Sequence, residues 1–359
     1  MTNLSDLPLR DSLKGRQPYG APQLHVPVAL NVNENTHPIP AEVKADIVER
    51  VAQAVAQINR YPDREFMNLR EALAVYLGEG LTAEQIWAAN GSNEVIQQIF
   101  QAFGGPGRKA LGFDPTYSMY SIIAQGTDTS YVSASRLERF ELTAEHASAQ
   151  IRLHQPNIVL LCSPNNPTGT PLSLDVVEAV YAATDGIVVV DEAYAEFAAD
   201  GVRSAITLLE GRPRLLISRT MSKAFAFAGA RVGYLAADAA VIDALRLVRL
   251  PYHLSAFTQA AAEAALDHAP VMLAAVDEIR VQRDRLVTEL AAMGLDPYRS
   301  DSNFVLFGGL NDAATVWQKL LDRGVLVRNV GIDGTLRVTA GTVAETSAFL
   351  DALLEVIRN

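Results

Sequence analysis

The chain has 359 residues, of which 49% are hydrophobic and 20% are charged, which is the composition of an ordinary globular protein. Because single hydrophobic cores stop growing at about 250–300 residues, this length predicts two domains. The formal charge is -11. An acidic chain without a visible basic face argues against nucleic-acid binding, since phosphate groups need a basic surface.

Cysteine, histidine and hydropathy patterns narrow the class of protein further. Cys162 is the only cysteine, which excludes an internal disulfide and fits a reducing compartment. No apolar run approaches the roughly 18–20 residues of a membrane helix, and the first residues lack the apolar segment of a signal peptide. We therefore expect a cytoplasmic protein without a membrane partner. The six histidines show no paired ligand spacing, so no metal site is predicted.

In the first two thirds of the chain, segments with helical spacing of apolar residues are followed by short apolar runs that are typical of strands. Helical spacing of apolar residues predicts helices over 41–58, 69–77 and 93–103. Short apolar runs predict strands near 109–113, 129–132, 157–162, 186–194, 215–218 and 233–237. Strands separated by helices indicate βαβ units, so we predict an α/β fold with a mostly parallel central sheet flanked by helices.

The pattern changes after Pro251. The remaining chain predicts a long helix around 257–290, a strand in SNFVLFGG, a helix around 312–323, strands in GVLVRNV and TLRVTAG, and a closing helix. We interpret this region as a smaller α+β domain. Residues 30–250 would then form the large domain, and residues 1–29 and 251–359 the small domain with an N-terminal arm.

Three polar signals follow buried strands of the predicted sheet. Asn166 lies in SPNNPTG, Asp191 ends the run IVVVD, and Lys223 lies in a turn of small residues after LLIS. Open α/β sheets bind ligands at the carboxyl ends of their strands, where these residues would meet. A buried carboxylate such as Asp191 needs a partner, and a cationic ligand nitrogen would serve. A desolvated lysine suits a nucleophile or Schiff-base partner.

The order of these motifs resembles the fold-type I, class-II aminotransferases that use pyridoxal phosphate. The resemblance rests on NNPTG, DEAYAEF and SKAFAFAGARVGY, in that order, with an arginine eight residues after the lysine. NGSNE, FDPTYSMY and PYHLSAFTQAAAEAAL extend it over most of the chain. Within this family the chain is most similar to histidinol-phosphate aminotransferases, through PYG, LNVNEN, RYPD and the pair GVLVRNV and TLRVTAGT.

The resemblance implies roles around the ring of pyridoxal 5'-phosphate. Lys223 would bond to the cofactor aldehyde and, once released by substrate, would carry the proton. Asp191 would pair with the pyridine nitrogen and keep the ring protonated, so that the ring can accept electrons. Asn166 and Tyr194 would donate to the ring oxygen, and Tyr117 would stack on the ring face.

The resemblance also implies a site for the cofactor phosphate, because helix-start amides, hydroxyls and guanidinium groups bind such anions. The implied residues are Ser92, Asn93, Glu94, Ser222 and Arg231, with Tyr61 reaching in from the second subunit of a homodimer.

For the substrate, Arg337 resembles the arginine that clamps the carboxylate of the amino donor, a bidentate task that suits guanidinium. Arg328 and Tyr19 would add a phosphate site, and Asn33 of LNVNEN is assigned to the same pocket. Two arginines in one small domain could accept a phosphate in one half-reaction and a dicarboxylate in the other.

The reaction that the resemblance implies is transamination of L-histidinol phosphate with 2-oxoglutarate, giving imidazole-acetol phosphate and L-glutamate, a step of histidine biosynthesis. An aromatic amino-acid aminotransferase shares nearly every motif and would differ by a wider apolar pocket. A threonine-phosphate decarboxylase, a lyase of the same fold, would release carbon dioxide without an amino acceptor. A non-catalytic role is disfavoured because Lys223, Asp191 and Arg231 are all retained.

Overall fold

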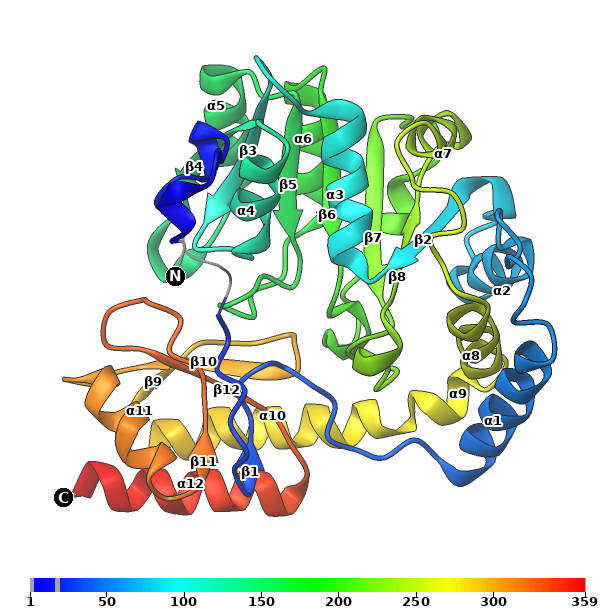
Figure 1. The fold of residues 1–359 in the computed structure, drawn as a ribbon. Helices are drawn as coiled ribbons and strands as arrows, with labels where there is room; N and C mark the ends of the chain where they lie inside the picture. Colours follow the sequence, from blue (N-terminus) through cyan, green and yellow to red (C-terminus); the bar gives the residue numbers. More distant parts are fainter. Residues whose placement is uncertain (1–2, 17–19, 359) are drawn as a thin grey trace.

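The structure, a computed structural model, describes residues 3–16 and 20–358. Its larger part is built on strands β2 (Ile86–Asn90), β3 (Lys109–Asp114), β4 (Ser130–Ser135), β5 (Ile158–Cys162), β6 (Ile187–Asp191), β7 (Leu215–Thr220) and β8 (Val232–Ala236). They form one seven-stranded sheet in the order β2-β8-β7-β6-β5-β3-β4 (Figure 1). Only β8 runs against its neighbours. The predicted mostly parallel sheet is therefore confirmed.

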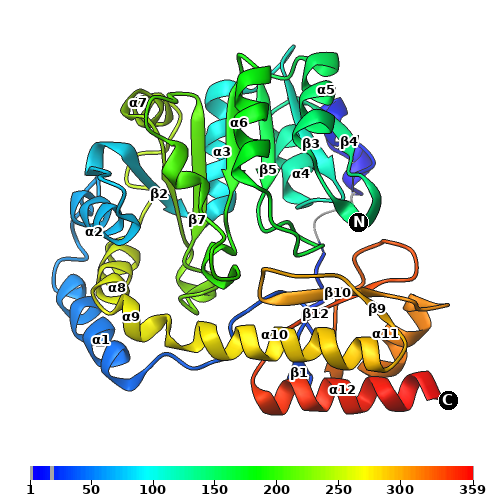
Figure 2. The same cartoon turned by 180° about the vertical axis from the view of Figure 1, so that it is seen from behind.

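Helices cover both faces of this sheet, which the central strands require. Every residue of β5, β6 and β8 is buried, and strands of this kind must be covered on both sides. One face carries α3 (Ser92–Phe103) and α4 (Met119–Gly126), and the other carries α5 (Ala144–His154) and α6 (Leu174–Ala183) (Figures 1 and 2). Helix α7 (Ala239–Arg246) packs beside α3 and β2.

The smaller part combines the end of the chain with its N-terminal arm. Strand β10 (Phe304–Gly308) pairs antiparallel with β9 (Asp296–Pro297) and with β12 (Leu336–Thr339). Strand β1 (Val28–Ala29) of the arm pairs in parallel with β11 (Val325–Leu326). Helices α10 (Ala274–Ala292), α11 (Ala313–Leu321) and α12 (Val343–Arg358) pack around these strands (Figure 2). The arm thus joins the C-terminal part before the chain enters the large sheet.

A further group of helices lies beside the large sheet. Helix α8 (Ala256–Asp267) packs against α1 (Ala41–Val55) and α2 (Met67–Leu77) and leads through α9 (Ala269–Met272) into α10. The division into domains at residues 30 and 251 stays a proposal, and α8 lies beyond that boundary although it packs against helices of the large domain. Within the described ranges, no helix has the length and apolar content needed to cross a membrane.

Two local expectations differ from the structure. The single helix predicted around 257–290 is wrong, because the chain forms α8, α9 and α10 in its place. His268 leaves the helical conformation, and Pro270 lies in the first turn of the next helix, which begins at Ala269, since proline cannot donate to a preceding turn. Strand β2 was not predicted, because five residues without alternation carry little periodic signal.

The short 3-10 turns are η1 (Leu4–Asp6), η2 (Asp11–Leu13), η3 (Ala83–Gln85), η4 (Glu138–Phe140), η5 (Ala195–Phe197), η6 (Ala205–Leu208) and η7 (Ala228–Ala230). Two of them, η5 and η7, follow strands of the large sheet and shape the loops at its carboxyl edge.

Candidate active site

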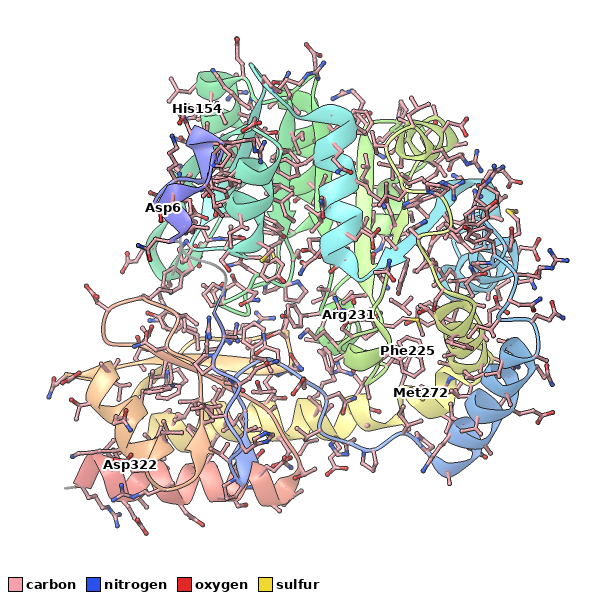
Figure 3. All side chains as sticks on the ribbon, viewed as in Figure 1. Asp6, His154, Phe225, Arg231, Met272 and Asp322 are labelled. Carbon is pink, nitrogen blue, oxygen red and sulfur yellow. The ribbon has the colours of Figure 1, made fainter. Side chains whose placement is uncertain are left out.

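A cavity of about 1190 Å³ opens at the carboxyl edge of the large sheet and is also lined by the arm and the C-terminal strands. Arg231 lies at this edge, on the side of the sheet nearer the small domain (Figure 3). The predicted site residues that line the cavity are Asn33, Ser92, Asn93, Tyr117, Asn166, Asp191, Tyr194, Ser222, Lys223, Arg231, Arg328 and Arg337. Residues distant in sequence are therefore brought together as the motifs indicated.

Lys223 follows β7 and reaches into the cavity. Its Nζ donates to the carbonyl oxygen of Val32 at 3.0 Å. Desolvation lowers the pKa of the Lys223 ammonium to about 8, and the positive charges of Arg337 and Arg231 act in the same direction. A larger share of the amine is consequently unprotonated near neutral pH than for an ordinary lysine, which is the condition for a nucleophile.

Asp191 ends β6 and is 2% exposed. Its Oδ2 accepts a hydrogen bond from the hydroxyl of Tyr120 at 2.8 Å, whereas its buried Oδ1 has no hydrogen-bond partner among the residues that the structure describes. Burial raises the pKa of Asp191 to about 6, although the bond from Tyr120 opposes the shift. An unpaired buried carboxylate oxygen beside a cavity is costly, and a ligand carrying a cationic N–H would complete it.

Tyr194 and Asn166 meet at one polar point of the cavity. The Tyr194 hydroxyl accepts hydrogen bonds from Asn33 Nδ2 at 3.0 Å and from Asn166 Nδ2 at 3.3 Å. Asn33 is held in the left-handed region at φ 57°, and its backbone N–H donates to Thr339 Oγ1 at 3.1 Å. Burial raises the pKa of Tyr194. The Tyr194 hydroxyl therefore stays protonated at neutral pH and can donate to a ligand oxygen.

A cluster of hydrogen-bond donors lies where α3 begins. Ser92 and Asn93 open this helix, and the Arg231 guanidinium donates to Ser222 Oγ at 3.3 Å. Gly91 has φ +86°, and a Cβ there would lie 2.3 Å from Arg231 Nη2. A helix start with hydroxyl and guanidinium donors fits an anion such as a phosphate.

Glycine also brings the strand β8 against this helix start. A Cβ at Gly233 would lie 2.0 Å from the backbone nitrogen of Ser92. Glu94, by contrast, is not part of the cavity lining. Its carboxylate accepts hydrogen bonds from the Asn90 backbone N–H at 2.8 Å and from Gln98 Nε2 at 3.2 Å. The Glu94 side chain therefore caps the first turn of α3, and only its backbone remains a candidate for anion binding.

Two arginines approach the cavity from adjacent segments of the C-terminal part of the chain. Arg328 and Arg337 lie opposite each other and exchange backbone hydrogen bonds of 2.9 and 2.8 Å, so their side chains leave the same side of the pair. Arg337 is 7% exposed and donates to Asn166 Oδ1 at 2.5 Å and to the Asn31 carbonyl at 2.9 Å. Arg328 is half-buried and donates to the Gly20 carbonyl at 3.4 Å.

Comparison with known proteins decides which family has this site. A model of the aminotransferases of class I and II matches residues 26–353. The chain belongs to this family. It is 66% identical over 356 residues to histidinol-phosphate aminotransferase from Paenarthrobacter aurescens, with 98% of this chain and 96% of that protein covered. It is 56% identical over 352 residues to the histidinol-phosphate aminotransferase of Thermobifida fusca, with 98% and 96% covered.

Solved structures agree with this assignment. Histidinol-phosphate aminotransferase from Sinorhizobium meliloti, in complex with pyridoxal-5'-phosphate, has a TM-score of 0.84 and 26% identity, covering 93% of this chain and 91% of that one. Aspartate aminotransferase from Thermus thermophilus with maleate has a TM-score of 0.80 and 26% identity, covering 92% and 91%. The predicted fold class, enzyme class and pyridoxal-phosphate cofactor of this aminotransferase are thus confirmed.

The geometry of the site also fits pyridoxal phosphate, independently of the comparisons. Asp191 Oδ1 is the acceptor that a protonated ring nitrogen needs. The donor cluster at α3 suits the cofactor phosphate, and the Tyr117 hydroxyl donates to Asn93 Oδ1 at 3.1 Å beside it. Among the described residues there is no group of three or more His, Cys, Asp or Glu side chains placed to hold a metal ion.

Of the predicted residues that the structure describes, Tyr61, like Glu94, lies apart from the cavity lining. Tyr61 is 79% exposed, and its ring stacks on Tyr252 with centroids 4.4 Å apart. Tyr19 lies outside the described residues. The site also contains a residue that the motif reading missed. Tyr120, the partner of Asp191, lies one helical turn after Tyr117, and this spacing in FDPTYSMY was the available signal.

Proposed function

We propose that this aminotransferase moves the amino group of L-histidinol phosphate to 2-oxoglutarate, giving imidazole-acetol phosphate and L-glutamate in a reversible step of histidine biosynthesis. The observation that carries the proposal is the 66% identity, over 98% of the chain, to a protein named histidinol-phosphate aminotransferase. We place the activity in the cytoplasm, which the lone, buried and free Cys162 supports.

The large-domain residues would hold the cofactor. Asp191 would bind its ring nitrogen, Asn166 and Tyr194 its ring oxygen, Tyr117 its ring face, and the donors Ser92, Asn93, Ser222 and Arg231 its phosphate. When bound, pyridoxal phosphate supplies an aldehyde for the amino group and a ring that accepts electrons. The ionised carboxylate of Asp191 would keep a positive charge at the ring nitrogen. A positive charge at that atom helps the ring to accept electrons.

Lys223 is assigned the proton transfers of the reaction. Its Nζ lies in the cavity with a pKa lowered to about 8, close to the operating pH at which an acid–base group is most effective. Lys223 would take a proton from the carbon that bears the amino group of the donor. In the second half-reaction it would deliver a proton to the carbon of the acceptor that receives the amino group. Desolvation is the main cause of the lowered pKa, and the positive charges of Arg337 and Arg231 add to it.

The two small-domain arginines would receive the anionic end of each substrate. Arg337, enclosed and held by Asn166 and Asn31, would clamp a carboxylate of glutamate or 2-oxoglutarate. Arg328, which is more open, would bind the phosphate of histidinol phosphate together with Tyr19. The planar guanidinium suits both anions because it donates two parallel hydrogen bonds.

The substrate proposal is tested by single-turnover half-reactions of the holoenzyme with L-histidinol phosphate, L-phenylalanine and L-glutamate, followed by the change in cofactor absorbance. Lys223→Ala is the control that cannot turn over. Preference for histidinol phosphate over phenylalanine by about a hundredfold in rate over affinity, near 2.7 kcal/mol, would support the proposal. An equal or faster reaction of phenylalanine would make the protein an aromatic aminotransferase, and carbon dioxide release without an acceptor would make it a lyase.

We further propose that the enzyme works as a homodimer and that Tyr61 completes the cofactor phosphate site of the other subunit. Two observations support this arrangement. Tyr61 is 79% exposed and does not line the cavity of its own chain. Apolar side chains are also exposed nearby in sequence and on the segment of its stacking partner Tyr252, namely Val48, Val55, Ile58, Leu247 and Leu250. Exposed apolar groups of this kind would be buried if they form one patch at a subunit interface.

Complementation between two impaired variants tests the shared site. In a mixture of Lys223→Ala and Tyr61→Ala subunits, a heterodimer with Tyr61 acting across the interface has one intact site, so about a quarter of all sites recover. If Tyr61 acts within its own chain, or does not act at all, mixing restores no intact site beyond the separate activities. Sedimentation of the wild type gives the oligomeric state independently.

A further inference from the structure

A second polar network lies beside the active site and outside the cavity lining. Arg219 on β7 donates from Nε and Nη2 to the same oxygen, Glu192 Oε2, at 3.1 and 2.8 Å. Its Nη1 lies 3.5 Å from Glu196 Oε1. The three side chains are only 12%, 5% and 9% exposed. Charges enclosed to this degree are tolerated when they are paired and hydrogen-bonded.

Both carboxylates of this network accept further hydrogen bonds. Glu192 accepts from the hydroxyl of Ser204 at 2.6 Å and from the Ala205 backbone N–H at 2.7 Å. Glu196 accepts from the hydroxyl of Tyr76, on α2, at 3.2 Å. A largely buried network with this many hydrogen bonds is rigid, because displacing one of its members breaks several bonds at once.

The network is attached to the segments that carry the site. Glu192 directly follows Asp191, Glu196 lies two residues after Tyr194, and Arg219 lies four residues before Lys223. Asp191 is paired with Ser218 in the sheet, and the Glu192 backbone N–H donates to the Ser218 carbonyl at 2.8 Å. Successive side chains of a strand point to opposite faces, so Asp191 faces the cavity while Glu192 faces Arg219 behind it.

A further contact connects the network to the segment after Lys223. The ring of Tyr76, whose hydroxyl bonds to Glu196, packs edge-on against Phe225 with centroids 5.3 Å apart. One guanidinium and its two carboxylates therefore join the ends of β6 and β7 and the loops beyond them.

We propose that Arg219 is a positioning residue of the active site, which through Glu192 and Glu196 fixes the backbone segments that carry Asp191, Tyr194 and Lys223. This proposal rests on the proposed function in one respect, namely that these three residues hold the cofactor. Arg219 touches neither the cavity nor a reacting atom, so its effect is transmitted through the backbone of β6, β7 and η5. It also balances the negative charge of Glu192 immediately beside Asp191.

The test compares Arg219→Met with the matched control Arg70→Met in the holoenzyme. Arg70 is also a buried arginine of the large domain, 1% exposed, and its Nε donates to the Ala83 carbonyl at 2.8 Å, away from the cavity. The measurements are the thermal midpoint, the cofactor dissociation constant from visible absorbance, and kcat and KM for histidinol phosphate. Arg219→Lys, which keeps the charge, measures rescue.

Both methionine variants are expected to lower the thermal midpoint. Only Arg219→Met should weaken cofactor binding and reduce kcat, each about tenfold, with KM nearly unchanged, because small displacements of reacting groups are costly in rate. Arg219→Lys should recover part of both losses. If Arg219→Met matches Arg70→Met, with cofactor affinity and kcat within about twofold of the wild type, Arg219 is only a stability residue and the proposal is overturned.

If Arg219→Met does not fold, Glu196→Gln takes its place, because it keeps the side-chain shape and removes one of the two charges that pair with Arg219. Weaker cofactor binding supports the proposal, and unchanged binding overturns it. Cofactor affinity also separates this proposal from the substrate assignment. A wild-type enzyme that binds the cofactor but does not turn over histidinol phosphate would contradict the proposed function. The cofactor affinities of Arg219→Met and Arg70→Met could still be compared.

Discussion

The two ends of the cavity differ in how their polar groups are held. The inner end, here called the site floor, consists of Asn166, Asp191, Tyr194 and Lys223 at the ends of large-domain strands. The outer end, here called the site mouth, consists of Gln23, Leu24, His25 and Arg328 from the arm and the small domain. In the site floor Asp191 and Tyr194 are 2% and 4% exposed. In the site mouth the three arm residues are exposed.

This difference separates the chemistry from the choice of substrate. Groups of the site floor are desolvated, and desolvation shifts the pKa values of Asp191 and Lys223 toward neutrality. Groups of the site mouth contact water and can be exchanged without disturbing a hydrogen-bonded core. We therefore expect substitutions in the site floor to affect every substrate, and substitutions in the site mouth to affect mainly the substrate whose anion they bind.

The largest effect is expected for Lys223→Ala, which removes both the attachment point of the cofactor and the proton carrier. Rates should fall by about 10⁴-fold with histidinol phosphate and with glutamate alike, because general acid–base catalysis by itself contributes up to that factor. Single-turnover absorbance changes measure this. Exogenous methylamine offers a sharper check, since partial recovery with both substrates would place the missing function at the amine.

Asp191→Asn keeps the volume of the side chain and removes its charge. Transamination should fall by about 10²–10³-fold, because a neutral amide no longer keeps the ring nitrogen protonated and the ring then accepts electrons less well. Steady-state kcat measures the loss. Asp185→Asn, at an exposed aspartate of the same domain, serves as the matched control and should leave kcat unchanged. A comparable loss for both variants would contradict the pairing of Asp191 with the ring nitrogen.

Arg328→Gln probes the site mouth. Rate over affinity for histidinol phosphate should fall by about 10–100-fold, since one charge-assisted hydrogen-bonded contact to the phosphate is removed. The value for glutamate should change by less than about threefold if Arg337 alone clamps its carboxylate. Equal losses for both substrates would remove the distinction between the two arginines.

The lowered pKa of Lys223, about 8, predicts a pH dependence for uptake of pyridoxal phosphate by the apoenzyme. Only the unprotonated amine reacts, so the rate should rise about tenfold from pH 7 to pH 9 and level off above pH 8. An ordinary lysine would show a nearly hundredfold rise over the same range without levelling. N-acetyl-lysine, followed under the same conditions by absorbance, provides that comparison.

The smallest effect is expected for Tyr120→Phe, which removes the donor to Asp191 Oδ2. That hydrogen bond favours the ionised carboxylate, so its loss should raise the pKa of Asp191 further above about 6. Because the ionised form is the active one, activity is lost as pH falls, and the acid limb of kcat/KM should move to higher pH by up to about one unit. Tyr117→Phe, which loses a bond to Asn93 instead, should leave the limb in place.

Several features of the site floor could be predicted because their signal is local. A buried β-branched run that ends in an aspartate, as at residues 187–191, marks both the strand and the carboxylate at its edge. Lys223 is similarly marked by the strand before it. Tyr120 was overlooked although its helical spacing from Tyr117 was visible, and Pro270 interrupts a helix that apolar spacing alone extends.

Other features depend on contacts between residues far apart in sequence. The pairing of Arg219 with Glu192 and Glu196 cannot be predicted from the sequence, because each of these charged residues would be expected at the surface. The same is true of the arm residues that line the cavity. By itself the sequence predicted the α/β layering and the polar residues at the strand ends, because hydrophobic period and strand-end polarity are short-range properties. The enzyme class followed from the resemblance of the motif order to a known family. Only the tertiary structure decided which polar groups are desolvated together, because burial is set by the packing of the whole chain.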